Sequence, residues 1–266
     1  MNNRLRAILL RHKVRLTSFL LFILLVSFAL PGGKKIKVYL VGDSTMCLYD
    51  KTRFPLTGWG MPFANYFDSS VVIDNKARGG RSSKSFMSEN LWKHVVDNLE
   101  EGDYVFIQFG HNDAANSADH PDRYASPEDY KKNLIMYVSD TRNKKANPVL
   151  VTPVTVRKFD SSGIAQETHA PYSKMVAEVA AEYKVPMVDL DGKSREFVQK
   201  LGPDFSKYLY MNLEAGENPL YPEGIHDNTH FNDFGARKMA EIVLGEIRTL
   251  DLGLADHIVK PRVAQK

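Results

Sequence analysis

The fold is decided by the stretch Lys37-Val38-Tyr39-Leu40-Val41-Gly42-Asp43-Ser44-Thr45. Its first five residues are mostly apolar and favour a β-strand, and the small residues that follow favour a turn. A buried strand that ends in such a turn presents the next side chain at the carboxyl edge of the sheet, where open α/β sheets bind their ligands. Ser44 is therefore a candidate nucleophile, although Asp43, Ser44 or Thr45 could equally cap a following helix.

Strand-like and helix-like segments alternate along the rest of the chain. Further strands are expected at 71–74, 103–109, 148–152 and 186–190, and helices at 127–145, 171–183 and 233–250. The segment 103–109 is almost continuously apolar, as is typical of a parallel strand that is covered on both faces. This alternation predicts an α/β fold, a three-layer sandwich with a parallel sheet of about five strands.

The N-terminal segment 1–29 has the pattern of a signal peptide, with five basic residues before the short apolar run 19–30. Cleavage is expected after Ala29, and the alternative is an uncleaved membrane anchor. The protein is thus expected to be exported, to the periplasm or the medium, or held at a membrane by this segment. One domain is expected over 36–250, followed by a C-terminal tail, 251–266.

The composition is that of an ordinary globular protein, with 43% hydrophobic and 25% charged residues in 266. Without the leader, 30 basic residues face 32 acidic ones. A nearly neutral protein is a poor match for nucleic acid, so no nucleic-acid partner is expected. Cys47 is the single cysteine and has no partner for an internal disulfide; a buried, unreactive thiol is expected there.

Three predicted strands end in small or amide-bearing residues, which parallel strands bring to one edge of the sheet. These ends are Gly42-Asp43-Ser44, Gly79-Gly80 and Gly110-His111-Asn112-Asp113. Acyl transfer through a serine requires N–H donors aimed at the developing oxyanion, and backbone amides of a glycine turn together with an asparagine amide can supply them. Taken alone, the glycines could simply form a turn, and the asparagine could bond its own backbone.

A candidate base for Ser44 occurs near the C-terminus, in Asp227-Asn228-Thr229-His230. A spacing of three residues allows the carboxylate to fold back onto the imidazole in a tight turn, as a serine hydrolase requires. The same stretch, His226 to His230, also approaches a zinc-protease helix motif, but Pro222, Gly224 and Asn228 disfavour a helix there.

Four of these motifs, in this order, resemble the blocks of the SGNH (GDSL-type) hydrolases: Gly42-Asp43-Ser44, Gly80, Gly110-x-Asn112-Asp113 and Asp227-x-x-His230. The detail is similar to the rhamnogalacturonan acetylesterases, and this resemblance covers about residues 36–248. It rests on Gly58-Trp59-Gly60, Asn75-x-Ala77-x-x-Gly80-Arg81-Ser82, Gln108-Phe109-Gly110-His111-Asn112-Asp113, and Asp227-Asn228-Thr229-His230-Phe231 with Gly235-Ala236.

The resemblance implies a flavodoxin-like fold in which Ser44 is the nucleophile, His230 the base and Asp227 the residue that orients it. The oxyanion hole would be formed by the amides of Ser44 and Gly80 and by the side chain of Asn112, with Gly79 as the alternative glycine donor. It further implies an esterase that removes O-acetyl groups from a plant cell-wall polysaccharide, expected to be pectic rhamnogalacturonan, through an acetyl-enzyme and without a metal or cofactor.

Several other residues are expected to contact the substrate. Trp59 would stack on a sugar ring or pack in the core, and His111 would lie beside the reacting group. Arg78, Arg81, Lys84 and Arg157 would bind an anionic sugar backbone or form a solvated basic face. The alternatives for function are a lipase or thioesterase of the same superfamily and a non-catalytic glycan-binding protein on this fold. The sequence does not specify an oligomeric state.

Overall fold

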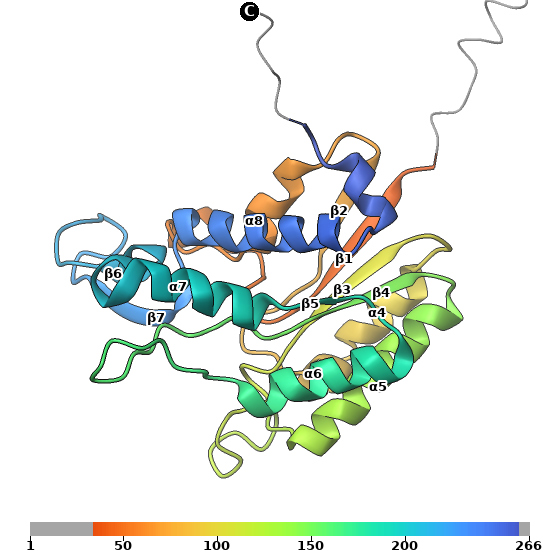
Figure 1. Cartoon of the computed structure of the whole chain (residues 1–266), viewed down its shortest axis with the longest axis horizontal. Helices are drawn as coiled ribbons and strands as arrows, with labels where there is room; N and C mark the ends of the chain where they lie inside the picture. The colour runs from red at the N-terminus through yellow and green to blue at the C-terminus, as the bar shows by residue number, and fades with distance from the viewer. Residues whose placement is uncertain (1–33, 261–266) are drawn as a thin grey trace, which may run out of the picture. The chain divides into compact units, whose positions relative to one another are not determined.

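The computed structural model describes residues 34–260. A parallel sheet has the strand order β2-β1-β3-β4-β5, the order of a flavodoxin-like sheet (Figure 1). Its strands are β1 (Ile36–Gly42), β2 (Val71–Asn75), β3 (Tyr104–Gln108), β4 (Asn147–Val151) and β5 (Met187–Val188). The predicted α/β fold with about five parallel strands is confirmed, and each predicted strand of the sheet is present within two residues of its expected ends.

Helices cover both faces of this sheet. Figure 1 shows α8 on one face and α4, α5 and α6 on the other. The helices are α2 (Gly60–Phe63), α3 (Ser83–Ser88), α4 (Leu91–Asn98), α5 (Pro127–Asn143), α6 (Ala170–Tyr183), α7 (Leu190–Ser206) and α8 (Asp233–Thr249), with short 3-10 turns η1 (Lys51–Arg53), η2 (Ala64–Tyr66), η3 (Lys207–Leu209) and η4 (Gly253–His257).

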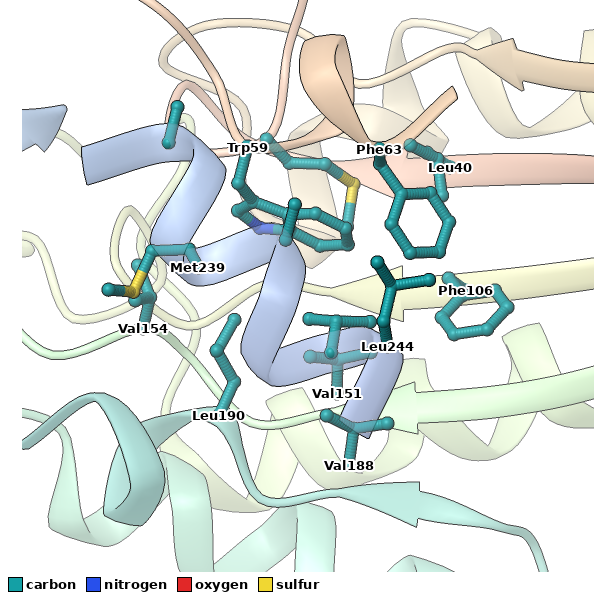
Figure 2. Packing of buried hydrophobic residues seen from close by; sticks show 14 of the residues in the cluster. Leu40, Trp59, Phe63, Phe106, Val151, Val154, Val188, Leu190, Met239 and Leu244 are labelled. Atoms are coloured by element: carbon teal, nitrogen blue, oxygen red, sulfur yellow. The ribbon is translucent and has the colours of Figure 1, made fainter. Parts of the chain in front are cut away.

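Two hydrophobic cores follow from the alternation of side chains along the buried strands. In β1, Val38 and Leu40 belong to the core under α8, whereas Tyr39 and Val41 belong to the core under α4, α5 and α6. Figure 2 shows the α8 core, where Phe63 is packed against Trp59 and Phe106. Because both faces are covered, β1 is fixed in position, and so is the turn that carries Ser44.

The start of α5 illustrates why the helices begin where the sequence predicts. Ser126 is the N-cap, and its hydroxyl accepts a hydrogen bond from the amide of Asp129, while Pro127 occupies the first helical position. Both features satisfy or remove amide donors that a helix leaves unpaired at its start. The helix ends at Asn143, two residues before the expected Lys145.

An antiparallel ribbon that was not predicted follows α7. It consists of β6 (Tyr210–Leu213) and β7 (Ile225–Phe231), and β7 carries both Asp227 and His230. A tight turn in a loop, and not a strand, was expected from Asp227 to His230. Pairing with β6 outweighs that local preference.

The structure describes only part of the two terminal segments that the sequence predicts, the leader and the C-terminal tail. The leader, 1–29, lies outside the described residues, so its expected role is not addressed by the structure. Of the expected C-terminal tail, residues up to 260 are described, and Leu254 and Ile258 are buried in the α8 core. No helix among the described residues is long and apolar enough to cross a membrane.

Candidate active site

Ser44 lies directly after β1 in a tightly bonded turn. The Asp43 carboxylate accepts hydrogen bonds from the amide and the hydroxyl of Thr45, at 2.9 and 2.8 Å. The hydroxyl of Tyr49 donates to the carbonyl of Ser44 at 2.9 Å. Asp43 thus stabilises the turn rather than facing the reacting group, and Ser44 is held at the carboxyl edge of the sheet with 7% of its surface exposed.

His230 is brought to Ser44 by the β6–β7 ribbon. Nε2 of His230 lies 2.9 Å from Oγ of Ser44, and Nδ1 lies 2.6 Å from Oδ2 of Asp227. The ribbon register jumps between Tyr210, which faces Phe231, and Met211, which faces Asp227. The three residues between bulge out of the strand. The tight turn expected from the spacing is therefore a bulge within β7.

The bulge also fixes the charge of Asp227. Its other oxygen, Oδ1, accepts hydrogen bonds from the amides of Thr229 and His230, at 2.7 and 3.0 Å. Partial burial raises the pKa of this carboxyl, but the hydrogen bonds from the His230 ring and from the two amides outweigh it and lower the pKa to about 2. Asp227 is thus ionised at neutral pH and holds the proton of His230 on Nδ1.

The backbone amides of Ser44 and Gly80, at this edge of the sheet, have no acceptor within the described residues. Gly80 has φ +77°, in the left-handed region that glycine adopts without strain. The neighbouring amide of Gly79 is directed to Cys47: burial raises the pKa of that thiol, and the Gly79 amide is among the groups that oppose the rise. The geometry therefore favours Gly80 over Gly79 as an oxyanion donor.

Asn112 lies beside these amides, and only 8% of its surface is exposed. One proton of its Nδ2 is donated to the carbonyl of Arg81 at 3.0 Å, which leaves the second proton for a ligand. Its Oδ1 accepts from Nη1 of Arg123 at 3.5 Å. The amide is thus held from both sides.

Arg123 was not singled out by the sequence. A Cβ added to Gly80 would lie 3.8 Å from Nη1 of Arg123, so this guanidinium is next to both Gly80 and Asn112. Its Nε is buried without a hydrogen-bond partner in the part of the chain that the structure describes. The residue lies in a polar loop, 114–125, where no spacing or motif distinguishes it from its neighbours.

Asp113 connects two of the three strand ends that supply the oxyanion donors, those of β2 and β3. It is fully buried and accepts hydrogen bonds from the amides of Gly110 and Ser83 and from the Ser83 hydroxyl. Burial raises its pKa to about 7, and the hydrogen bonds act against this rise. The motif predicted Asp113 as part of a block, but not this bracing role.

His111, expected to contact substrate, is paired with His169 at the start of α6. Nδ1 of His111 lies 3.2 Å from Nε2 of His169. Burial lowers the pKa of both rings, that of His169 to about 4, and His111 also senses the charges of Asp43, His230 and Asp227. His111 thus lies beside the Ser44–His230 pair as a neutral ring, and a contact with substrate stays a prediction.

Trp59 was expected to stack on a sugar or to pack in the core, and the structure places it in the core, fully buried (Figure 2). Its Nε1 donates to Oε1 of Gln108 at 2.7 Å, and Nε2 of Gln108 donates to the Thr45 hydroxyl at 2.7 Å. Of the two expectations for Trp59, the packing role is the one that its burial supports. Trp59 supports the turn of Ser44 from beneath.

The guanidinium of Arg157, expected to contact the substrate, is bound by protein atoms. Its Nε donates to the Ser206 hydroxyl and its Nη1 to Oδ1 of Asn228, both at 3.0 Å, and its Nη2 donates to the carbonyl of Pro203. All three guanidinium nitrogens are therefore bound to protein, and the residue braces the β7 bulge. Its contact with substrate stays a prediction.

Arg81 and Lys84 are likewise engaged with protein atoms, though less completely. Arg81 pairs with Glu89 at 3.0 Å and donates to the Gly79 carbonyl at 3.0 Å, and Lys84 donates to the Pro121 carbonyl at 2.8 Å. Arg81 therefore fixes the glycine turn from outside. Its contact with substrate stays a prediction.

The zinc alternative required a helix at His226 to His230, and this segment is strand β7. Within residues 34–260 no group of three or more His, Cys, Asp or Glu side chains is placed to hold a metal ion. The side chains that do converge are a serine hydroxyl, an imidazole, a carboxylate and several N–H donors. This is the set with which proteins perform acyl transfer to and from serine.

Comparison with known proteins was made on sequence and on structure. The model of the GDSL-like Lipase/Acylhydrolase family matches residues 40–238. The chain is 37% identical over 226 residues to the rhamnogalacturonan acetylesterase RhgT of Bacillus subtilis, which covers 85% of this chain and 95% of that protein.

Two solved structures share the fold at lower identity. Protein YxiM of Bacillus subtilis superimposes with a TM-score of 0.71 at 24% identity, over 82% of this chain and 58% of that one. Axe2, an acetylxylan esterase from Geobacillus stearothermophilus, superimposes with a TM-score of 0.61 at 18% identity, over 86% and 99% of the two chains.

Proposed function

Because this chain belongs to the GDSL-like lipase/acylhydrolase family and is a carboxylic ester hydrolase, we propose that it is a serine esterase that removes O-acetyl groups from pectic rhamnogalacturonan. The observation that carries the reaction type is the hydrogen-bonded series from Ser44 through His230 to Asp227. The substrate is supported by the 37% identity to a rhamnogalacturonan acetylesterase over nearly the whole of both proteins.

In the first half of the reaction Oγ of Ser44 attacks the acetyl carbonyl carbon. Its proton passes to Nε2 of His230, which lies 2.9 Å away. The ionised Asp227 stabilises the imidazolium that forms. The bond to the sugar oxygen then breaks, and that oxygen takes the proton from His230, so the sugar leaves as a free hydroxyl and the acetyl group stays on Ser44.

The negative charge of the tetrahedral intermediate is received by the amides of Ser44 and Gly80 and by Nδ2 of Asn112. All three come from the edge of one sheet and are held before substrate arrives, so little reorganisation is needed as the charge develops. Arg123 adds a positive charge next to Oδ1 of Asn112, the amide oxygen that does not face the intermediate.

In the second half, water replaces the sugar hydroxyl. His230 takes a proton from the water as the water oxygen attacks the acetyl carbon. The bond from that carbon to Oγ of Ser44 then breaks, Oγ takes the proton from His230, and acetic acid leaves and ionises to acetate in solution. The same three donors stabilise the second intermediate. No step requires a group beyond water and the side chains named.

The charge around Ser44 favours this reaction over the hydrolysis of a long-chain ester. The cavity next to Ser44 has a mixed lining, in which the charged side chains of Asp50, Arg53, Lys76 and Arg78 lie beside apolar ones such as Leu48 and Leu91. A fatty acyl chain gains little from a charged wall, which would have to lose its water to receive the chain. A sugar with many hydroxyls is better matched to it.

The test is acetate release from acetylated rhamnogalacturonan, acetylated xylan and aryl esters of short and long acids. We expect the highest kcat/KM on the rhamnogalacturonan and a loss of at least about 10⁴-fold in Ser44→Ala. Faster hydrolysis of the long-chain esters would favour a lipase. Binding of the polysaccharide without acetate release would favour a glycan-binding protein.

We further propose that the protein acts outside the cytoplasm, on the basis of the sequence of its first 29 residues. The test is to fractionate the cells and to measure the mass of the protein in the periplasm, the membrane and the medium. A shortened protein in the periplasm or medium indicates cleavage, and the full-length protein in the membrane indicates anchoring. Recovery in the cytoplasm with an intact N-terminus would contradict export.

A further inference from the structure

A cavity of about 550 Å³ lies beside Ser44, next to the turn that follows β2. It is formed by the loop after β1, the 75–79 turn and the start of α4, and its walls include Cys47, Tyr49, Arg53, Arg78, Gly79 and Leu91. Its size is in the range of sites that enclose small ligands. The reaction proposed above uses none of its charged residues.

The wall of this cavity touches Ser44 directly. Tyr49 donates its hydroxyl proton to the Ser44 carbonyl, and Sγ of Cys47 lies 3.6 Å from the same oxygen. A Cβ added to Gly79 would lie 3.8 Å from Cβ of Ser44. The cavity is therefore adjacent to the main chain and Cβ of Ser44.

The charged groups of the wall are three cations and one carboxylate: Arg53, Lys76, Arg78 and Asp50. Lys76 is paired with Asp74 at 2.9 Å, and Asp50 accepts the amide of Thr52 at 2.9 Å. These two residues thus already have partners.

Arg53 and Arg78 differ from them. Neither guanidinium has a carboxylate partner among residues 34–260, and Arg53 lies over the Tyr49 ring, 5.1 Å from its centre. The backbone of Arg78 is fixed, since its amide donates to the carbonyl of Gly42 at 2.9 Å. Each guanidinium is a forked donor, and such a group binds a carboxylate with two parallel hydrogen bonds.

We propose that this cavity binds a uronate unit of an acidic polysaccharide, next to the unit whose acetyl group Ser44 removes, with Arg53 and Arg78 as the carboxylate partners. The inference rests on the proposed function, because it extends the substrate of the same site. Leu91 and the Tyr49 ring offer apolar surface for the C–H face of the sugar.

The experiment compares two substrates that differ only in charge: an acetylated oligouronide with free carboxylates and the same oligomer as its methyl ester. We expect the wild type to prefer the free acid by at least about tenfold in kcat/KM, mostly through KM, and to lose this preference as salt is raised. Arg78→Gln and Arg53→Gln should each remove most of the preference, and Arg78→Lys should retain part of it.

Turnover of 4-nitrophenyl acetate by each variant reports whether its reactive centre is intact, and kcat/KM on the oligomers is expressed relative to it. The matched control is Arg248→Gln, an exposed arginine in the last turn of α8, roughly 20 Å along the helix from its start beside His230. This control should keep the wild-type preference.

The outcomes separate the two proposals. Acetate release without a preference for the free acid, or a preference that survives in both Arg53→Gln and Arg78→Gln, would overturn the uronate site and leave the esterase intact. No acetate release from either oligomer, with 4-nitrophenyl acetate still hydrolysed, would overturn the polysaccharide substrate and the uronate site together.

Discussion

The hydroxyl oxygen of Ser44 lies 2.9 Å from Nε2 of His230, although 186 residues separate the two in the chain. Ser44 is placed by the end of β1, and His230 by a bulge in β7. The reactive pair therefore exists only when the first strand of the sheet and the ribbon before α8 are both in place.

Asn112 is expected to carry much of the oxyanion stabilisation, because the second proton of its amide has no partner among the described residues. Asn112→Ala should lower kcat for acetate release by about 10²- to 10³-fold with little change in KM. Arg123→Gln should give a smaller loss, since Arg123 acts through Asn112. Equal kcat values for wild type and Asn112→Ala would exclude this role.

Trp59 is expected to support the Ser44 turn through Gln108 and Thr45. Trp59→Phe leaves the buried Oε1 of Gln108 without its donor and should lower the free energy of unfolding by about 1–3 kcal/mol, and kcat with it. Trp92→Phe is the matched control, because Trp92 donates to Asp140 and takes no part in the hydrogen bonds that link Gln108 and Thr45. It should lower stability but not kcat; the same kcat in both variants would contradict the supporting role.

Asp227 is expected to link stability to acid pH. Because its pKa is about 2 in the folded protein, below its ordinary value of 3.8, its contribution is present above pH 3.8 and is lost as the pH falls toward 2. The difference in unfolding free energy between wild type and Asp227→Asn, measured with urea, should shrink over this range. A constant difference from pH 5 to 2.5 would contradict the low pKa.

His169 is expected to act in a different pH window. Its pKa is about 4 in the folded protein and 6.5 ordinarily, so the unfolded chain takes up the proton first as the pH falls. Stability should therefore decrease between pH 6.5 and 4. His169→Gln should weaken that decrease, whereas His120→Gln, at an exposed position, should leave it unchanged.

The sheet could be predicted from the sequence because its strands are buried on both faces and are therefore apolar along their length. The positions of Ser44, Asn112 and His230 could be predicted because each follows a recognisable block. What the sequence did not predict was β7, because its strand conformation depends on pairing with β6 and not on the preferences of its own residues.

The burial of Trp59 could not be predicted from the residues around it in the sequence. A tryptophan between two glycines is compatible with a surface loop and with a buried turn. Its burial is decided by how closely the backbone of Gly58 approaches Cys47, where an added Cβ would lie 2.1 Å from the Cys47 carbonyl oxygen. Such a contact between separate segments has no signature in the local sequence, and the same holds for Arg123 beside Gly80.

The central claim is that Ser44 is the nucleophile, and covalent labelling tests it most directly. A fluorophosphonate should react once per chain, and peptide mass analysis should locate the adduct on Ser44, with activity lost in proportion to labelling. His230→Gln should label far more slowly. Labelling of another residue, such as Cys47, or full activity after Ser44 is labelled, would contradict the account.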